Sequence, residues 1–205
     1  MRISPSRKAN KKRQKGPNMN INKKELLSIP NCMSYFRILL IPLFCITYIR
    51  ADSRMDYYMA AGIIVISGVT DFLDGKIARK FHMITEFGKL IDPVADKLTH
   101  GAIAFCLSLR YHYMKYLFLV MVLKEGFMLV MGVINLRHGK KLDGAKMYGK
   151  ICTTTLFIVL AALVFFPGIP EIAANILIFV EIIILLITWA LYIPEFWKMR
   201  QTWGQ

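Results

Sequence analysis

The sequence predicts an all-α integral membrane protein with six transmembrane helices preceded by an amphipathic juxtamembrane helix. Of the 205 residues, 56% are hydrophobic and only 20% are charged. A water-soluble domain of this size cannot bury that much apolar surface. The apolar residues gather in six stretches, each about long enough to cross a bilayer. These observations exclude a soluble enzyme, a disordered protein and a large domain outside the membrane.

Residues 1–21 are predicted to form a basic, disordered cytoplasmic tail. Residues 1–24 contain nine of the 27 Lys and Arg residues and no acidic residue. Ser, Pro and Gly residues between these charges favour disorder. Because a hydrophobic bundle follows, the expected partner of the tail is anionic membrane lipid, not nucleic acid. A tail that is merely solvated is the alternative.

Residues 22–200 are predicted to form one six-helix transmembrane domain. It begins with NKKELLSIPN (22–31), an amphipathic pattern that stops at Pro30 and is expected to lie in the headgroup plane. The six apolar spans then fall at about residues 35–50, 57–73, 90–109, 114–136, 151–167 and 172–194.

The loops predict the orientation of these spans. Six spans place both termini on the same side of the membrane. Nineteen Lys and Arg residues lie in the termini and loops of that side, against four in the opposite loops. Since basic residues accumulate on the cytoplasmic side, both termini are expected to face the cytoplasm.

Four aspartates flank the turn between the second and third spans. Asp71 and Asp74 are three residues apart, and Asp92 and Asp96 are four apart, so each pair shares one helix face. If the two spans are antiparallel neighbours, four carboxylates meet at the membrane boundary and require cations. A pair of hard divalent ions, Mg²⁺ or Mn²⁺, with oxygen ligands would neutralise them. Two such ions can stabilise both the attacking and the leaving oxygen of a phosphoryl transfer.

The residues between the aspartates fit a phosphate ligand. Gly75 lets a ligand approach the backbone, Ala78 keeps the same wall low, and Arg79 offers a planar fork for phosphate. Gly88 lies where two helices must come close. In the alternative interpretation, the acids are helix caps or partners of nearby Lys and Arg residues. Four acids in two helical pairs favour the chemical interpretation.

The string D-x2-D-G-x2-A-R-x8-G-x3-D-x3-D, from Asp71 to Asp96, resembles the complete signature of the CDP-alcohol phosphatidyltransferase family. The upstream segment IPNCMSYFRILLIP (29–42) is similar to the opening motif of the phosphatidylglycerophosphate synthase branch of that family. Thr85 and the A-D-K at 95–97 also fit this branch.

The resemblance implies transfer of a phosphatidyl group from CDP-diacylglycerol to an alcohol, with release of CMP. It implies two divalent cations, Mg²⁺ or Mn²⁺, held by Asp71, Asp74, Asp92 and Asp96, with Asp96 also acting as the general base. A homodimer in the bacterial cell membrane, with a cytoplasmic active site, is implied as well. The residues expected to bind CDP-diacylglycerol are Asn31, Ser34, Arg37, Gly75, Ala78, Arg79, Thr85 and Gly88.

The expected acceptor is glycerol 3-phosphate. Lys124, Arg137 and Lys150, which lie in or at the ends of spans four and five, are the candidates for holding its phosphate. Lys124 lies within a span and therefore needs a partner or a role. Glu125 projects about 100° further round the helix, so simple pairing with Lys124 is not expected. Span four also departs from the usual R-E-x2-V-x-G-x-R string of the branch, since K-E-G-F-M-L-V-M-G stands at 124–132.

Other functions are open at this point. Within the family, the alternatives are a cardiolipin synthase that uses phosphatidylglycerol and a serine or inositol-phosphate phosphatidyltransferase. The alternative from another class is a membrane transporter that binds cations, in which acids near mid-span would lie beside broken helices. Among the remaining polar residues, Glu181 in the last span is expected to make a helix-packing hydrogen bond.

Overall fold

The computed structural model describes residues 28–80, 88–137 and 146–201. In these ranges the chain forms six α-helices and no strand. The predicted tail lies outside the described residues. The helices are α2 (Ile29–Ile49), α3 (Arg54–Lys80), α4 (Gly88–Ser108), α5 (Met114–Arg137), α6 (Met147–Phe165) and α7 (Glu171–Gln201).

Within the described ranges, five helices are long and apolar enough to cross a membrane, and α4 is the exception. The first half of α4 carries Lys89, Asp92, Asp96 and Lys97, which lower its hydropathy. Large apolar side chains are exposed along the helices, where lipid would cover them. These features confirm an all-helical, multi-pass membrane protein. The sixth span and the juxtamembrane helix stay predictions.

The first span starts earlier than the sequence predicted. Helix α2 already begins at Ile29, about two turns before the expected start, and Pro30 lies in its first turn. The first N–H groups of a helix have no partner within it, so a proline is tolerated there. Residues 29–31 were assigned to the juxtamembrane segment, and this boundary was wrong, because they form the opening turn of the span. Residues 22–27 of the expected juxtamembrane helix lie outside the described part.

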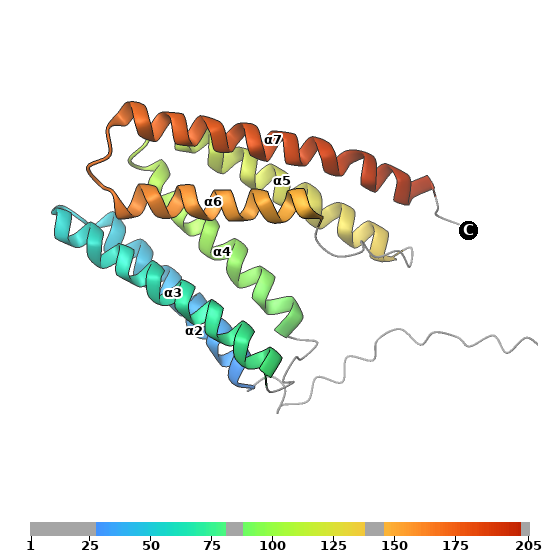
Figure 1. Ribbon diagram of the computed structural model, residues 1–205, viewed down its shortest axis with the longest axis horizontal. Coiled ribbons are helices and arrows are strands. Elements are labelled where there is room, and N and C mark those ends of the chain that lie inside the picture. The colour runs from blue at the N-terminus through green and yellow to red at the C-terminus, as the bar shows by residue number, and fades with distance from the viewer. Residues whose placement is uncertain (1–27, 81–87, 138–145, 202–205) are drawn as a thin grey trace, which may run out of the picture.

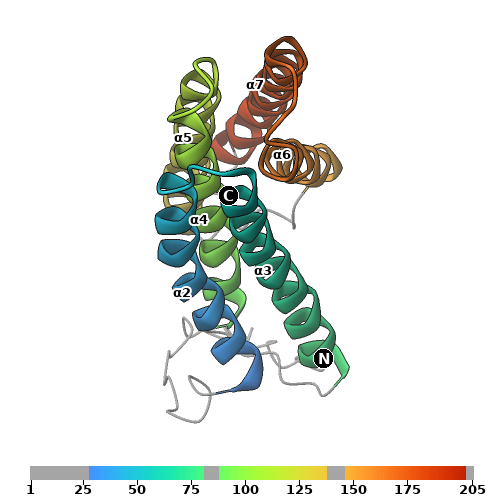
Figure 2. The same ribbon diagram turned by 90° about the vertical axis from the view of Figure 1, so that its left-hand side faces the viewer.

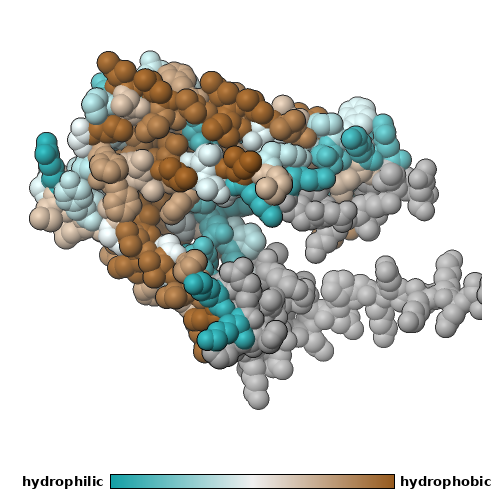
Figure 3. Space-filling model, in the orientation of Figure 1, coloured by the Kyte–Doolittle hydropathy of each residue, from teal (hydrophilic) through white to brown (hydrophobic). Residues whose placement is uncertain are grey.

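The helices converge at one end of the molecule and spread apart at the other (Figures 1 and 2). The turns α2–α3, α4–α5 and α6–α7 lie at the converging end. Helix α4 packs against α2, α5 and α6 and so joins the two sides of the bundle. Hydrophilic surface lies in the recess between the two sides, whereas hydrophobic surface covers much of the outer faces (Figure 3).

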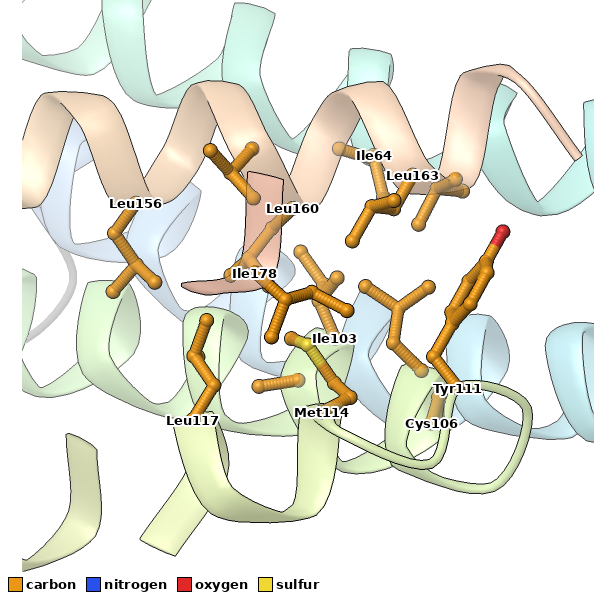
Figure 4. Close-up of a cluster of buried hydrophobic side chains, with 14 of the residues drawn as sticks. Ile64, Ile103, Cys106, Tyr111, Met114, Leu117, Leu156, Leu160, Leu163 and Ile178 are labelled. Carbon is orange, nitrogen blue, oxygen red and sulfur yellow. The ribbon is translucent and has the colours of Figure 1, made fainter. Parts of the chain in front are cut away.

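The hydrophobic core lies towards the converging end. Side chains from α3 to α7 meet there and are almost completely buried, as Ile103 and Leu160 show (Figure 4). Ala60, Ala61 and Ala104 are also buried, and their small side chains allow the helices to approach closely. Packing therefore fixes the helices at this end and leaves the opposite half of the bundle to polar groups.

Arg110 links neighbouring segments at the converging end of the bundle. It lies in the turn between α4 and α5, and its Nη2 donates a hydrogen bond to the carbonyl oxygen of Pro167 in the α6–α7 turn. Its guanidinium also lies 4.6 Å from the ring centroid of Tyr57 in α3, within the range of a cation–π contact. One side chain thus joins three segments that are far apart in the sequence.

The close approach of α6 and α7 gives a first prediction, for Gly149→Ala. A Cβ at Gly149 would overlap the hydroxyl of Tyr192 and lie 3.2 Å from its Cζ. Tyr192 is buried, and its ring packs 4.8 Å from that of Tyr148, so it has little room to move. Overpacking of about 1–3 kcal/mol should outweigh the gain of about 1 kcal/mol in helix propensity. We expect a lower thermal unfolding temperature in detergent.

Gly132→Ala is the matched control for this substitution. Gly132 lies in α5, and a Cβ there would have no neighbour within 4 Å. The unfolding temperature of the Gly132→Ala protein should equal or exceed that of the wild type. A Gly149→Ala protein at least as stable as the wild type would contradict the close approach of the two helices.

Candidate active site

Arg37 of α2 gathers three of the four predicted aspartates. Its guanidinium makes ion pairs with Asp71 and Asp74 of α3 and with Asp96 of α4. The distance from Nη2 to Asp74 Oδ2 is 3.2 Å, and the Arg37 side chain is only 3% exposed. A buried guanidinium with several carboxylate partners is fixed in position. The acids of α3 and α4 therefore converge on α2.

The fourth aspartate is held by the same helix. Ser34 lies one turn before Arg37, and its hydroxyl donates a hydrogen bond to Asp92 Oδ1 at 2.5 Å. Asn31, Ser34 and Arg37 are spaced by three residues and are all buried. They form a polar stripe on an otherwise apolar helix. The sequence assigned these three residues to the nucleotide, and the contacts of Ser34 and Arg37 with the aspartates were not foreseen.

Helix periodicity explains how α3 and α4 bring their aspartates to the site. Asp71 and Asp74 lie on the face of α3 that meets α2, and Asp92 and Asp96 lie one turn apart on α4. Gly88 begins α4 and is buried. The predicted convergence of four aspartates is thus present in the structure.

Among the described side chains, carboxylates outnumber guanidinium groups in this cluster. Three carboxylates lie against Arg37, the fourth accepts a hydrogen bond from Ser34, and the Asp71 and Asp96 side chains are 50% and 44% exposed. Ligands can therefore reach the carboxylates of Asp71 and Asp96. Hard divalent cations prefer such a set of oxygen donors.

The carboxylates are not arranged as a closed metal site. Within the described residues, no three His, Cys, Asp or Glu side chains lie close enough together to hold a metal ion. Asp71, Asp74 and Asp96 face Arg37 instead, and Asp92 faces Ser34. The carboxylate oxygens fit a divalent cation, provided that they turn away from the guanidinium.

Several predicted CDP-diacylglycerol contacts are only partly placed. Gly75, Ala78 and Arg79 belong to the last turns of α3, but their side-chain surroundings lie outside the described part. Thr85 lies outside the described residues altogether. The nucleotide contacts of these residues, and of Gly88, stay predictions.

A second charged cluster lies between α4 and α5. The Nζ of Lys124, a residue that is 5% exposed, is 2.8 Å from Glu125 Oε1. The Nζ of Lys97 in α4 is 2.6 Å from Glu125 Oε2. The expectation that Lys124 and Glu125 do not pair was wrong. Their long side chains reach round the helix, although the two Cα–Cβ bonds diverge.

The three predicted acceptor-phosphate residues differ in their surroundings. Lys124 is buried in the middle of α5, whereas Lys150 is exposed in the first turn of α6. Arg137 is the last residue of α5, and the position of its side chain lies outside the described part. The structure therefore does not bring these residues together in one described cluster.

Two further polar residues lie within the bundle. Glu181 of α7 is completely buried and accepts a hydrogen bond from Thr155 Oγ1 of α6 at 3.3 Å, so the predicted packing hydrogen bond is confirmed. His100 of α4 lies one turn after Asp96, and its ring centroid is 5.7 Å from that of Phe157 in α6. Sequence reasoning gave His100 no role, although the spacing D-x3-D-x3-H continues the polar face of α4.

Comparison with known proteins identifies relatives of this sequence. The model of the CDP-alcohol phosphatidyltransferase family matches residues 27–194. A cardiolipin synthase (CMP-forming) of Streptomyces coelicolor is 34% identical over 152 residues, which cover 73% of this chain and 70% of the relative. A CDP-diacylglycerol–glycerol-3-phosphate 3-phosphatidyltransferase of Aquifex aeolicus is 30% identical over 184 residues, 84% of this chain and 98% of the relative.

A protein of the same name from Rickettsia bellii is 40% identical over 76 residues, which cover 37% of this chain. The match spans only 41% of that relative's length.

Proposed function

The chain belongs to the CDP-alcohol phosphatidyltransferase family, and from this membership we propose that it transfers a phosphatidyl group from CDP-diacylglycerol to glycerol 3-phosphate. The products are phosphatidylglycerophosphate and CMP. The observation that supports this acceptor is the Aquifex aeolicus relative, which matches along 98% of its length and carries the name of this reaction. The chain is thus an enzyme of phospholipid biosynthesis.

In the proposed mechanism, the acceptor hydroxyl attacks the phosphorus that carries the diacylglycerol. The bond from this phosphorus to the CMP oxygen breaks, and its electron pair leaves with CMP. Asp96 accepts the hydroxyl proton as general base. Its side chain is 44% exposed, so an acceptor can reach it. To take the proton, its carboxylate must turn away from Arg37.

The proposed ligands of two divalent cations, Mg²⁺ or Mn²⁺, are Asp71, Asp74, Asp92 and Asp96. When bound, the cations would neutralise the charge that develops on the phosphoryl group and on CMP. Arg37 holds three of these carboxylates near one another despite their mutual repulsion. We propose that this guanidinium keeps the acid cluster assembled between turnovers.

The nucleotide of CDP-diacylglycerol is proposed to bind beside this cluster, on the cytoplasmic side of the bundle. The positive-inside distribution supports this side for the active site and both termini. Location in the bacterial cell membrane and a homodimer are part of the proposal, as is binding of anionic lipid by residues 1–21. The proposed contacts to CDP-diacylglycerol are Asn31, Ser34, Arg37, Gly75, Ala78, Arg79, Thr85 and Gly88.

A cardiolipin synthase is the second candidate. The Streptomyces coelicolor relative bears that name and is 34% identical across 73% of this chain. With this function the acceptor would be phosphatidylglycerol. The two candidates share the reaction and CMP as a product, and they differ in the molecule that supplies the hydroxyl group. Membership of the family argues against the transporter alternative.

The test is the release of CMP from CDP-diacylglycerol by the purified protein in the presence of Mg²⁺. Glycerol 3-phosphate, phosphatidylglycerol, serine and inositol phosphate are supplied in separate reactions. We expect CMP with glycerol 3-phosphate and little with the others. CMP release with phosphatidylglycerol instead would identify a cardiolipin synthase.

The acceptor phosphate gives a second prediction. A phosphate must be met by fixed cations, and the proposed ones are Lys124, Arg137 and Lys150. Arginine provides a bidentate fork and lysine a point charge. Arg137→Ala should therefore raise the KM for glycerol 3-phosphate most, by about tenfold or more. The KM for CDP-diacylglycerol should change little. Steady-state kinetics of the three alanine variants measure both values.

If all three variants keep the wild-type KM for glycerol 3-phosphate, the phosphate binds elsewhere. Lys198→Ala is a suitable control, because Lys198 is an exposed residue in the last turn of α7.

A further inference from the structure

The carboxylate of Glu125 bridges two helices near the aspartates and has no part in the proposed mechanism. Glu125 of α5 places Oε2 at 2.6 Å from Lys97 Nζ and Oε1 at 2.8 Å from Lys124 Nζ. Each carboxylate oxygen thus holds a different ammonium group. Lys97 directly follows Asp96 in α4. Glu125 therefore connects the helix of the proposed base with the proposed acceptor-phosphate lysine.

Burial makes this bridge important for Lys124. The side chains of Lys124, Glu125 and Lys97 are 7%, 31% and 53% exposed. An ammonium group inside a helical bundle is costly unless an anion or another acceptor lies against it. Glu125 supplies that anion and orients Lys124 along α5 towards α4. Lys97 is the exposed end of the bridge.

The charge of the bridge suits a phosphorylated acceptor. Two ammonium groups and one carboxylate carry a net charge of +1 beside four aspartates. A phosphomonoester carries nearly two negative charges at neutral pH. Such a group would be attracted to the lysines and repelled by the aspartates, which would turn its hydroxyl end towards Asp96.

We propose that Glu125 is a positioning residue for the acceptor phosphate, and that it acts by holding Lys97 and Lys124 side by side at the edge of the aspartate cluster. The proposal rests on the proposed function, in which the acceptor is a small phosphomonoester. In a Glu125→Gln protein the shape is kept, but the two lysines lose their shared anion.

The test is steady-state kinetics of the full-length Glu125→Gln and Glu125→Asp proteins with glycerol 3-phosphate. For Glu125→Gln, we expect a rise in the acceptor KM of about tenfold or more, with kcat within about threefold and an almost unchanged KM for CDP-diacylglycerol. Glu125→Asp keeps the negative charge and should restore the acceptor KM to within about threefold of the wild type.

The matched control is Glu195→Gln. Glu195 of α7 also pairs with a lysine, Lys146, at 3.5 Å, and both side chains are about one-third exposed. This substitution removes an ion pair of the same kind outside the aspartate cluster, and all kinetic constants should stay at wild-type values. Thermal unfolding of every variant shows whether its fold is intact.

An unchanged acceptor KM in Glu125→Gln would overturn the proposal. Equal losses in Glu125→Gln and Glu125→Asp, or equal rises in the KM values of both substrates, would also overturn it, since they indicate a purely structural role. The wild-type protein tests the proposed function separately. If it releases no CMP with glycerol 3-phosphate, that function fails and the role of Glu125 falls with it.

Discussion

The Asp96→Asn protein is expected to release almost no CMP while remaining folded in the membrane. Asparagine keeps the shape of the side chain and an oxygen that can accept a hydrogen bond from Arg37. It loses the negative charge that takes a proton and binds a cation. Loss of a general base alone lowers the rate by about 10²- to 10⁴-fold, and loss of a cation ligand lowers it further. We expect turnover to fall by at least about a thousandfold.

CMP release with saturating substrates and Mg²⁺ measures this effect, and thermal unfolding in detergent tests the fold. Asp56→Asn is the matched control, because Asp56 lies in the first turn of α3 and accepts its hydrogen bonds from Ser53 and from the backbone N–H of Asp52. Its activity should be that of the wild type. An Asp96→Asn protein with normal turnover would remove Asp96 from the mechanism.

The second large effect is expected for Arg37→Met. Methionine approximates the length of the side chain but leaves the carboxylates of Asp71, Asp74 and Asp96 without their shared cation. Breaking a buried ion pair from one side typically costs about 3–5 kcal/mol. We expect a loss of stability of about 3 kcal/mol, because the half-exposed Asp71 and Asp96 recover part of their hydration. CMP release should fall strongly as well.

Mg²⁺ should stabilise this variant more than the wild type, because the cation and the guanidinium compete for the same carboxylates. The measurement is thermal unfolding with and without saturating Mg²⁺. Arg54→Met, at the exposed start of α3, is the control and should respond like the wild type. Equal stability of Arg37→Met and the wild type without Mg²⁺ would show that Arg37 does not hold the cluster together.

Local spacing explains how far the acid cluster could be predicted from the sequence. Intervals of three and four residues place Asp71 with Asp74, and Asp92 with Asp96, whatever the rest of the chain does. The contact of Arg37 with three of them depends on how α2 packs against α3 and α4. This packing is a tertiary property that no local pattern reveals. The sequence therefore predicted that these acids lie near one another, but it did not reveal the cation that gathers three of them.

The other differences also have physical causes. Residues 29–31 were placed before the span because proline disfavours helix in the residue before it, yet Pro30 is equally suited to the first turn of a helix. The pairing of Lys124 with Glu125 was missed because an angle between Cβ directions ignores the reach of long side chains. In α4 the polar groups of the site lower the hydropathy of the helix that carries them.

The contacts of Arg110 restrict rotation of α3 at the converging end of the bundle. Helix α3 has 27 residues and is therefore about 40 Å long. Asp71 and Asp74 lie about 21–26 Å from Tyr57 along this helix, so a rotation of about 5° at the Tyr57 end would displace them by about 2 Å. That displacement exceeds the tolerance of reacting groups, which is well under 1 Å for efficient catalysis. The position of the aspartates therefore depends partly on the contacts of one side chain at the opposite end of the bundle.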